Sequence, residues 1–240
     1  MEHGIVLQPE VIGYYKNFPI SNSLLTSWIV MAVLITVALV VRFKISLVPT
    51  SKFYNLSETV VDFGYDTVDD LAHDKAKVFF PIVMTFFLYI LFGNLLGLLP
   101  GFATVTFKGV PLFRSINSDL NMTLGLALTS AVLTHGFALY YLGIVDYLKK
   151  WFTLNPIFLF VGLLELVGEV TKIISLSFRL FGNIFAGEVV LSTISSIFAF
   201  VVPLPFYFLE IIVGFVQAAV FMMLTLVFMV LLSEKHGTEH

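Results

Sequence analysis

One long apolar stretch of the sequence, residues 156–200, contains charged side chains that could move protons. Its charged residues are Glu165, Glu169, Lys172, Arg179 and Glu188. Carboxylates take up and release protons, whereas an arginine keeps its proton in proteins and can only attract or repel charge. Holding such a cation at the centre of a bilayer costs at least about 2.5 to 3.5 kcal/mol, so some function must require it. The pattern favours proton transfer along acidic groups, interrupted by a permanent cation.

Helical spacing predicts that most polar side chains of this stretch share one face. At about 100° per residue, the residues within about 40° of Arg179 are Glu165, Gly168, Lys172, Ser175 and Asn183. Glu188 falls at about 180° from Arg179, on the opposite face. We therefore expect Glu188 to face a different neighbour.

The last apolar stretch, residues 206–232, carries a second polar stripe. Its residues Glu210, Gly214 and Gln217 lie within about 60° of one another on a helix. Because two consecutive spans run in opposite directions, Glu188 and Glu210 should lie near one membrane surface. The glutamates at the start of the long stretch should lie near the other surface, with the arginine between them. A proton could then cross only on a mobile carrier that passes the arginine.

The two basic residues also have structural interpretations. Lys172 could extend to the membrane surface, or it could pair with Glu165 or Glu169. Arg179 could form a salt bridge with a glutamate of the same chain, although intramembrane charges more often serve function.

The remaining polar residues have alternatives of the same kind. Glu188 and Glu210 could share one proton, which is compatible with a relay. Ser175 and the glycines could simply allow close helix packing. His135 stands alone among the apolar residues of segment 120–144. A hydrogen-bonded packing role is therefore favoured over a relay role for it.

Composition predicts that lipid surrounds most of the chain. Of 240 residues, 58% are hydrophobic and only 12% are charged, more apolar surface than one soluble core could bury. The net charge is -3, and no basic run could follow a phosphate backbone, so nucleic acid is not an expected partner. No cysteine occurs, and among the five histidines only the tail pair His236 and His240 approaches metal-ligand spacing, so neither a metal nor a cofactor is expected.

The chain is expected to form a single membrane domain over residues 1–240, all α-helical, with about five crossings. Basic residues after the first span, such as Arg42 and Lys44, predict an N-terminus outside and a C-terminus in the cytoplasm. Asp119 is the expected N-cap of the third span. The predicted segments are 1–23 outside the membrane, spans 24–41, 78–99 and 120–144, a long helix 156–200, a turn at Pro203 and Pro205, and a last helix 206–232.

The long helix cannot stand upright in a bilayer. Residues 156–200 would extend about 67 Å at 1.5 Å per residue, against a hydrocarbon core of about 30 Å. It must break or lie steeply inclined.

Residues 51–77 predict an amphipathic helix on the cytoplasmic side. Apolar residues recur at helical spacing and alternate with Glu58, Asp62, Asp66, Asp69 and Asp70. Anionic lipid would repel this acidic face, so docking against another protein is favoured.

A known family shares these motifs. The run Ser175-Leu-Ser-Phe-Arg179-Leu-Phe-Gly-Asn183-Ile-Phe-Ala-Gly-Glu188 resembles the signature of the membrane-embedded stator subunit a (subunit 6) of F-type ATP synthases, of bacterial or chloroplast type. Three further segments are similar to that family: Asn94-Leu-Leu-Gly-Leu-Leu-Pro100-Gly, Asp119-Leu-Asn121-Met-Thr123 and Gln217-Ala-Ala-Val-Phe-Met.

The resemblance implies a fold, partners and residue roles. In that family the last two helices form a long, strongly tilted hairpin beside a rotating ring of c subunits, each with one carboxylate. By similarity, Arg179 faces those carboxylates and separates two offset proton half-channels. The expected partners are the c-ring, the peripheral-stalk b subunits and lipid of a bacterial plasma membrane. The resemblance assigns the outer half-channel to Asp119, Asn183, Glu188, Glu210 and Gln217, and the inner one to Glu165, with Glu169 as a second inner carboxylate. Asn121 and Ser175 are further expected residues of the proton path.

Two positions depart from the family pattern. The position of Glu210 is a histidine in some members, which implies a carboxylate-to-carboxylate relay here. Glu165 and Glu169 supply two inner carboxylates where some relatives have one. The resemblance implies a non-catalytic subunit, and no nucleotide motif occurs.

A secondary transporter or channel with a site at a broken helix is the alternative function. Such folds usually show corresponding interrupted segments in two halves, and this sequence shows no internal repeat.

Overall fold

The computed structural model describes residues 9–43, 52–99, 105–107, 109–151, 156–198 and 201–234. Parts of the sequence-based expectations lie outside these residues, among them residues 1–8, the basic flank at Lys44, residue 51, Pro100 after the second span and residues 199–200 of the long helix.

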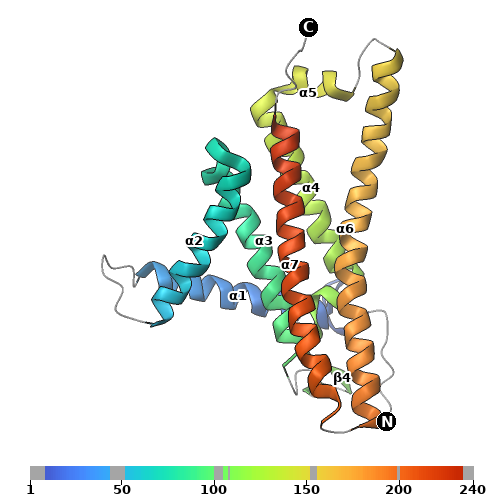
Figure 1. Cartoon of the computed structure of the whole chain (residues 1–240). Coiled ribbons are helices and arrows are strands. Elements are labelled where there is room, and N and C mark those ends of the chain that lie inside the picture. The colour runs from blue at the N-terminus through green and yellow to red at the C-terminus, as the bar shows by residue number, and fades with distance from the viewer. Residues whose placement is uncertain are drawn as a thin grey trace.

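Helices dominate the described residues, as the composition predicted (Figure 1). The α-helices are α1 (Asn22–Phe43), α2 (Lys52–Ala72), α3 (Ala76–Gly97), α4 (Leu120–Leu142), α5 (Ile144–Trp151), α6 (Pro156–Ile197) and α7 (Pro203–Ser233). Two short 3-10 helices, η1 (His73–Lys75) and η3 (Ile116–Ser118), lie before α3 and α4.

Two small antiparallel hairpins were not expected from the sequence. One pairs β1 (Val11–Tyr15) with β2 (Phe18–Ser21), and the other pairs β3 (Thr106–Phe107) with β4 (Val110–Pro111). Neither segment has the sustained alternation of polar and apolar residues that signals a strand, so pattern reasoning missed both.

Within the described residues, four helical segments are long and apolar enough to cross a membrane. They are α1, α4, α7 and the segment Asn55–Gly97, which ends with α3. Helix α6 is longer than α1, α4 and α7 but is not in that set. Its five charged side chains lower its hydropathy, although its length of 42 residues corresponds to about 63 Å.

Helices α6 and α7 run antiparallel and lie side by side (Figure 1). The sequence predicted a turn at Pro203 and Pro205, with the helix starting at 206, and the structure corrects this. Both prolines lie in the first turn of α7. A proline fits there because the first amides of a helix have no intrahelical acceptor to lose.

Tight apolar packing joins α3, α4, α6 and α7. One cluster holds Phe79 and Val83 of α3 against Leu226 and Met229 of α7. A second cluster brings Leu180 of α6 against Phe221 and its neighbours. Close packing of this kind holds membrane helices together, because lipid offers no hydrophobic force between them. The first cluster holds α3 against α7, and the second holds α6 against α7.

The third span ends earlier than expected and is followed by an additional helix. The sequence predicted a helix over 120–144, but α4 stops at Leu142 because Gly143 adopts a φ of 80°. That left-handed conformation favours glycine. It turns the chain into α5, which returns against the start of α6 (Figure 1).

The contact between α5 and α6 leaves no room for a side chain at one position. A Cβ on Gly162 of α6 would overlap the backbone carbonyl of Trp151, the last residue of α5. The absence of a side chain at Gly162 therefore sets the closeness of the two helices.

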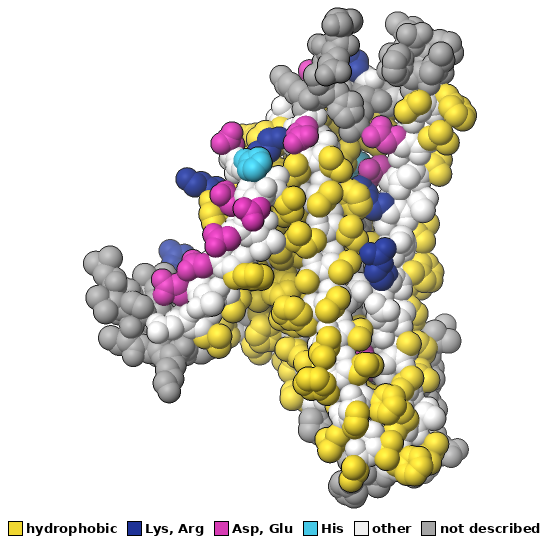
Figure 2. All heavy atoms as spheres, viewed as in Figure 1, with side chains coloured by type: hydrophobic (Ala, Val, Ile, Leu, Met, Phe, Trp, Pro, Cys, Tyr) yellow, Lys and Arg dark blue, Asp and Glu magenta, His cyan; other side chains and the backbone are white. Residues whose placement is uncertain are grey.

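Helix α2 is amphipathic, as its spacing predicted. Val68 and Ala72 are buried in the first apolar cluster, whereas Glu58, Asp62 and Asp66 are exposed. Figure 2 shows this row of acidic side chains along α2.

Candidate functional site

Arg179 lies on an exposed face of α6. Among the described residues it makes no ion pair or hydrogen bond, so the structural salt bridge considered from the sequence is not formed within that part of the chain. It lines a cavity of about 520 Å³ together with Lys172, Ser175, Leu224 and Phe228. Figure 2 shows basic side chains on α6 amid apolar ones.

The face that carries Arg179 continues to Asn183 one turn further along α6. The amide nitrogen of Asn183 donates a hydrogen bond to Oε1 of Gln217 on α7, at 2.9 Å. Ser175 is exposed on the same face. The arginine is thus flanked by polar groups that can accept or donate hydrogen bonds.

Glu210 of α7 is buried against α6. Only 5% of the residue is exposed, and its carboxyl group occupies the position that a Cβ on Gly187 would take. Within the described part of the chain its Oε1 has no hydrogen-bond partner. A buried carboxyl group in such a position can exist neutral, and it can also gain or lose a proton if water or a neighbouring group reaches it.

Glu188 faces away from Arg179, as the helical spacing predicted. Its carboxyl group lies beside Arg114, within hydrogen-bonding reach of Ser118, and close enough to Glu210 for electrostatic repulsion. Two carboxyl groups and one guanidinium therefore share this end of the molecule. Sequence reasoning identified both glutamates but not Arg114 or Ser118.

Asp119 caps α4, as expected. One of its carboxylate oxygens accepts a hydrogen bond from the backbone amide of Asn121 at 2.9 Å. The other accepts one from the hydroxyl of Ser23 in α1 at 2.5 Å. The structure gives Asn121 a backbone role at the cap, and its exposed side chain does not join the Glu188 cluster.

A chain of amides fixes the neighbouring helices. Asn117 donates to Oδ1 of Asn94 at 2.6 Å, and Asn94 donates to the carbonyl of Gly214 at 3.0 Å. Gly214 lies one turn from both Glu210 and Gln217, so the amides hold the polar stripe of α7 in register with α3. The signal available in the sequence was Asn94, a polar residue in an otherwise apolar span, whereas Asn117 stands among other polar residues.

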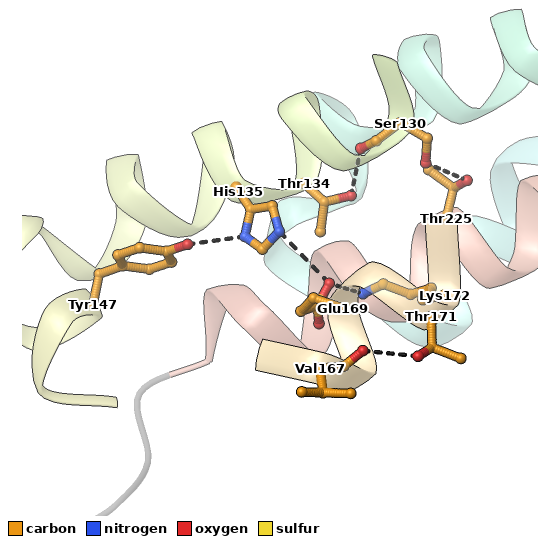
Figure 3. Close-up of polar contacts among 9 residues, drawn as sticks. All are labelled: Ser130, Thr134, His135, Tyr147, Val167, Glu169, Thr171, Lys172 and Thr225. Carbon is orange, nitrogen blue, oxygen red and sulfur yellow. Dashed lines mark hydrogen bonds and ion pairs between the residues drawn. The ribbon is translucent and has the colours of Figure 1, made fainter. Parts of the chain in front are cut away.

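A second polar cluster lies at the other end of α6 (Figure 3). Nζ of Lys172 is 2.5 Å from Oε2 of Glu169, so of the alternatives left open for Lys172 the pairing with Glu169 is the one formed. Glu165 lies about one turn nearer the start of the helix and is half-buried. The same carboxylate oxygen of Glu169 is 3.6 Å from Nε2 of His135.

Comparison with known proteins connects the chain to one family. The family model for the ATP synthase A chain matches residues 24–230. A protein of Legionella pneumophila (strain Corby) described as ATP synthase subunit a is 32% identical over 212 residues, covering 88% of this chain and 86% of that protein. The chain belongs to the ATP synthase subunit a family.

Two further members of the ATP synthase subunit a family show similar coverage. The protein of Moorella thermoacetica is 30% identical over 222 residues, covering 92% of this chain and 95% of that protein. The ATP synthase subunit a 2 of Syntrophotalea carbinolica is 33% identical over 217 residues, covering 88% and 85%. The family identifies the chain as a multi-pass membrane subunit of F-type ATP synthase, with a part in proton transport and ATP synthesis.

Proposed function

We propose that this chain provides two offset proton half-channels separated by Arg179, and that Arg179 faces the carboxylates of a rotating c-ring. Proton flow is thereby coupled to rotation, and the chain itself catalyses no bond chemistry. The exposed and unpaired guanidinium, within the described residues, is the observation that carries the proposal.

An exposed guanidinium on an apolar membrane face needs a partner. Exposure to lipid would cost at least about 2.5 to 3.5 kcal/mol. A ring helix with a carboxylate at the same depth would remove that cost, because the opposite charges attract strongly where water is scarce. Arg179 would then favour the ionised form of each ring carboxylate that passes it.

The outer half-channel would use the cluster around Glu188 and Glu210. A proton would enter past Asp119 and Ser118, bind to Glu188 or Glu210, and reach the ring beside the amides of Asn183 and Gln217. The closeness of the two glutamates supports this assignment, because two carboxyl groups within repulsion range favour a single shared proton.

The inner half-channel would use Glu165, Glu169 and Ser175. Between the two half-channels the protonated ring carboxylate is neutral and can turn through lipid, where a charge would be costly. At the inner side it would lose its proton because Arg179 favours the ionised carboxylate.

The membrane arrangement follows the same proposal. The chain would cross a bacterial plasma membrane about five times, with its N-terminus outside, its C-terminus in the cytoplasm, and α6 and α7 steeply inclined along the ring. The c-ring would lie on the Arg179 face. The acidic face of α2 would meet peripheral-stalk b subunits.

Disulfide crosslinking in the assembled ATP synthase tests the proposed contact. The sequence contains no cysteine, so a single introduced cysteine has no background within the chain. Ser175→Cys should crosslink to a cysteine on the ring helix near its carboxylate. Val132→Cys, on α4 and 70% exposed, is the matched control and should not crosslink. Absence of crosslinking at Ser175 in an active complex, or equal crosslinking at both positions, would refute the proposal.

A further inference from the structure

Four side chains from three helices form a continuous polar chain at the α5 end of the molecule (Figure 3). The hydroxyl of Tyr147 on α5 is 2.9 Å from Nδ1 of His135 on α4. Nε2 of His135 is 3.6 Å from Oε2 of Glu169 on α6, and the same oxygen is 2.5 Å from Nζ of Lys172. The imidazole therefore has a hydroxyl on one side and a carboxylate on the other.

The polar chain connects the Arg179 cavity with the molecular surface. Lys172 lines that cavity, and its Nζ lies 3.6 Å from the centre of the Phe228 ring. The His135 side chain at the other end is 27% exposed and bonds to Tyr147 of α5, which is not among the segments long and apolar enough to cross a membrane. A path of ionisable groups thus runs from the side proposed to face the ring to the solvent at α5.

The surroundings of His135 suit both of its protonation states. A neutral imidazole can accept a hydrogen bond at Nδ1 from the Tyr147 hydroxyl, and an imidazolium can donate one to the same oxygen. Burial raises the pKa of Tyr147, so the hydroxyl keeps its proton at neutral pH. Glu169 opposite Nε2 can accept from either form of the ring. Lys172 competes for that carboxylate, which keeps Glu169 from holding the imidazolium permanently.

Charged and titratable groups lie near His135 on the helices packed against α4. Helix α5 contributes Tyr147, and its Asp146 pairs with Lys149 at 3.8 Å on an exposed side. Helix α6 contributes Glu169 and Lys172. Helix α7 contributes the apolar Leu232, which packs with Trp151, and the Trp151 ring centre is 6.3 Å from that of His135. Helix α4 itself adds no second ionisable group to these contacts.

We infer that His135 is an acid–base residue of the inner half-channel that passes protons between Glu169 and water at the α5 surface. The inference rests on the proposed function and adds a residue to it. In each passage the neutral ring starts as the tautomer that carries its proton on Nδ1 and donates it to the Tyr147 oxygen, so Nε2 is free to accept. The O–H bond of protonated Glu169 then breaks as an N–H bond forms at Nε2. The imidazolium then releases one proton to water, and the ring ends as neutral as it began. Imidazole suits this role because it exchanges protons in the neutral pH range.

The test is ATP-driven proton pumping by the complete ATP synthase in proteoliposomes, with the pH varied on the ATP side. His135→Gln keeps a side chain that forms hydrogen bonds but cannot titrate. We expect its rate to fall about tenfold, less than a lone proton-transfer group typically contributes, because Glu165 offers a parallel route. The ratio of its rate to the wild-type rate should change with pH. Taking this ratio removes the pH dependence of ATP hydrolysis itself, which the two complexes share.

Tyr147→Phe provides a second variant if His135→Gln fails to assemble. It removes the hydroxyl that bonds to Nδ1 and keeps the ring packing, so it should also give a ratio that changes with pH. Tyr140→Phe is the matched control, because Tyr140 is exposed on α4 and contacts Tyr141 through its ring. This control should retain the wild-type rate at every pH.

The outcomes separate the inference from the proposed function. A rate ratio that stays constant with pH in the assembled variants, whether near one or lowered, would overturn the inference and leave His135 a packing residue. Arg179→Ala in the same assay reports on the proposed function. If Arg179→Ala stops pumping while both variants show a constant ratio, only the inference fails. If Arg179→Ala still pumps, the proposed function fails.

Discussion

The carboxyl group of Glu210 on α7 lies directly against Gly187 of α6. A side chain on residue 187 would occupy the position of that carboxyl group. The contact joins a residue of the proposed proton path to a glycine with no chemistry of its own.

Gly187→Ala should therefore impair proton transport without preventing assembly. The added methyl group would push the flexible end of Glu210 aside, at a cost of about 1 to 3 kcal/mol if the helices must also shift. Gly125→Ala is the control, because a Cβ on that exposed glycine of α4 would meet no atom within 4 Å. ATP-driven pumping per assembled complex measures both. Equal rates in the two variants would mean that the position of the Glu210 carboxyl group does not matter.

Glu210→Gln tests the carboxyl group itself. Glutamine keeps the shape of the side chain but cannot exchange a proton, so proton flow should fall by about 100-fold or more if no other group replaces it. Glu234→Gln, at an exposed residue directly after α7, makes the same chemical change outside the proposed path and should leave the rate unchanged. A Glu210→Gln complex that pumps normally would leave the outer path to Glu188 alone.

Asn94→Ala should destabilise the chain. It removes the acceptor of the Asn117 amide and the donor to the Gly214 carbonyl, and it leaves both groups buried. Each unsatisfied buried group costs about 1 to 3 kcal/mol. Thermal unfolding of the purified complex in detergent should show subunit a dissociating at a lower temperature. Unchanged thermal stability would mean that water replaces the lost contacts.

Gly162→Ala should loosen α5 from α6. The new methyl group would overlap a backbone carbonyl, which cannot move aside as a side chain can. We expect faster proteolysis of residues 143–156 in Gly162→Ala than in Gly136→Ala, whose Cβ would meet no atom within 4 Å. Equal cleavage rates would show that α5 does not depend on this contact.

Periodicity predicted the relationships that depend on a single helix. The opposite directions of Arg179 and Glu188 follow from nine residues at about 100° each, and the structure retains them. The all-α membrane class followed from the apolar composition, because a backbone surrounded by lipid has few ways to satisfy its hydrogen-bonding groups.

Relationships between distant segments were not predictable from periodicity. Arg114 and Ser118 approach Glu188 across some 70 residues of sequence, and no spacing rule connects them. The return of α5 depends on the conformation of Gly143 and on the space beside Gly162, both set by tertiary packing. His135 was expected to be a hydrogen-bonded packing residue. Its hydrogen bond to Tyr147 agrees with that prediction. Its proximity to Glu169 depends on how α6 packs against α4, which the sequence alone does not show.

The coupling of proton flow to ATP turnover in Arg179 variants tests the central claim most directly. Arg179→Ala should leave the complex assembled, with ATP hydrolysis no longer driving proton uptake into proteoliposomes. Arg179→Lys should also be impaired. A buried lysine can lose its proton and its charge, and its ammonium group lacks the planar set of N–H donors that a guanidinium holds in fixed geometry. An assembled Arg179→Ala complex that pumps protons at the wild-type ratio of protons to ATP would contradict the account.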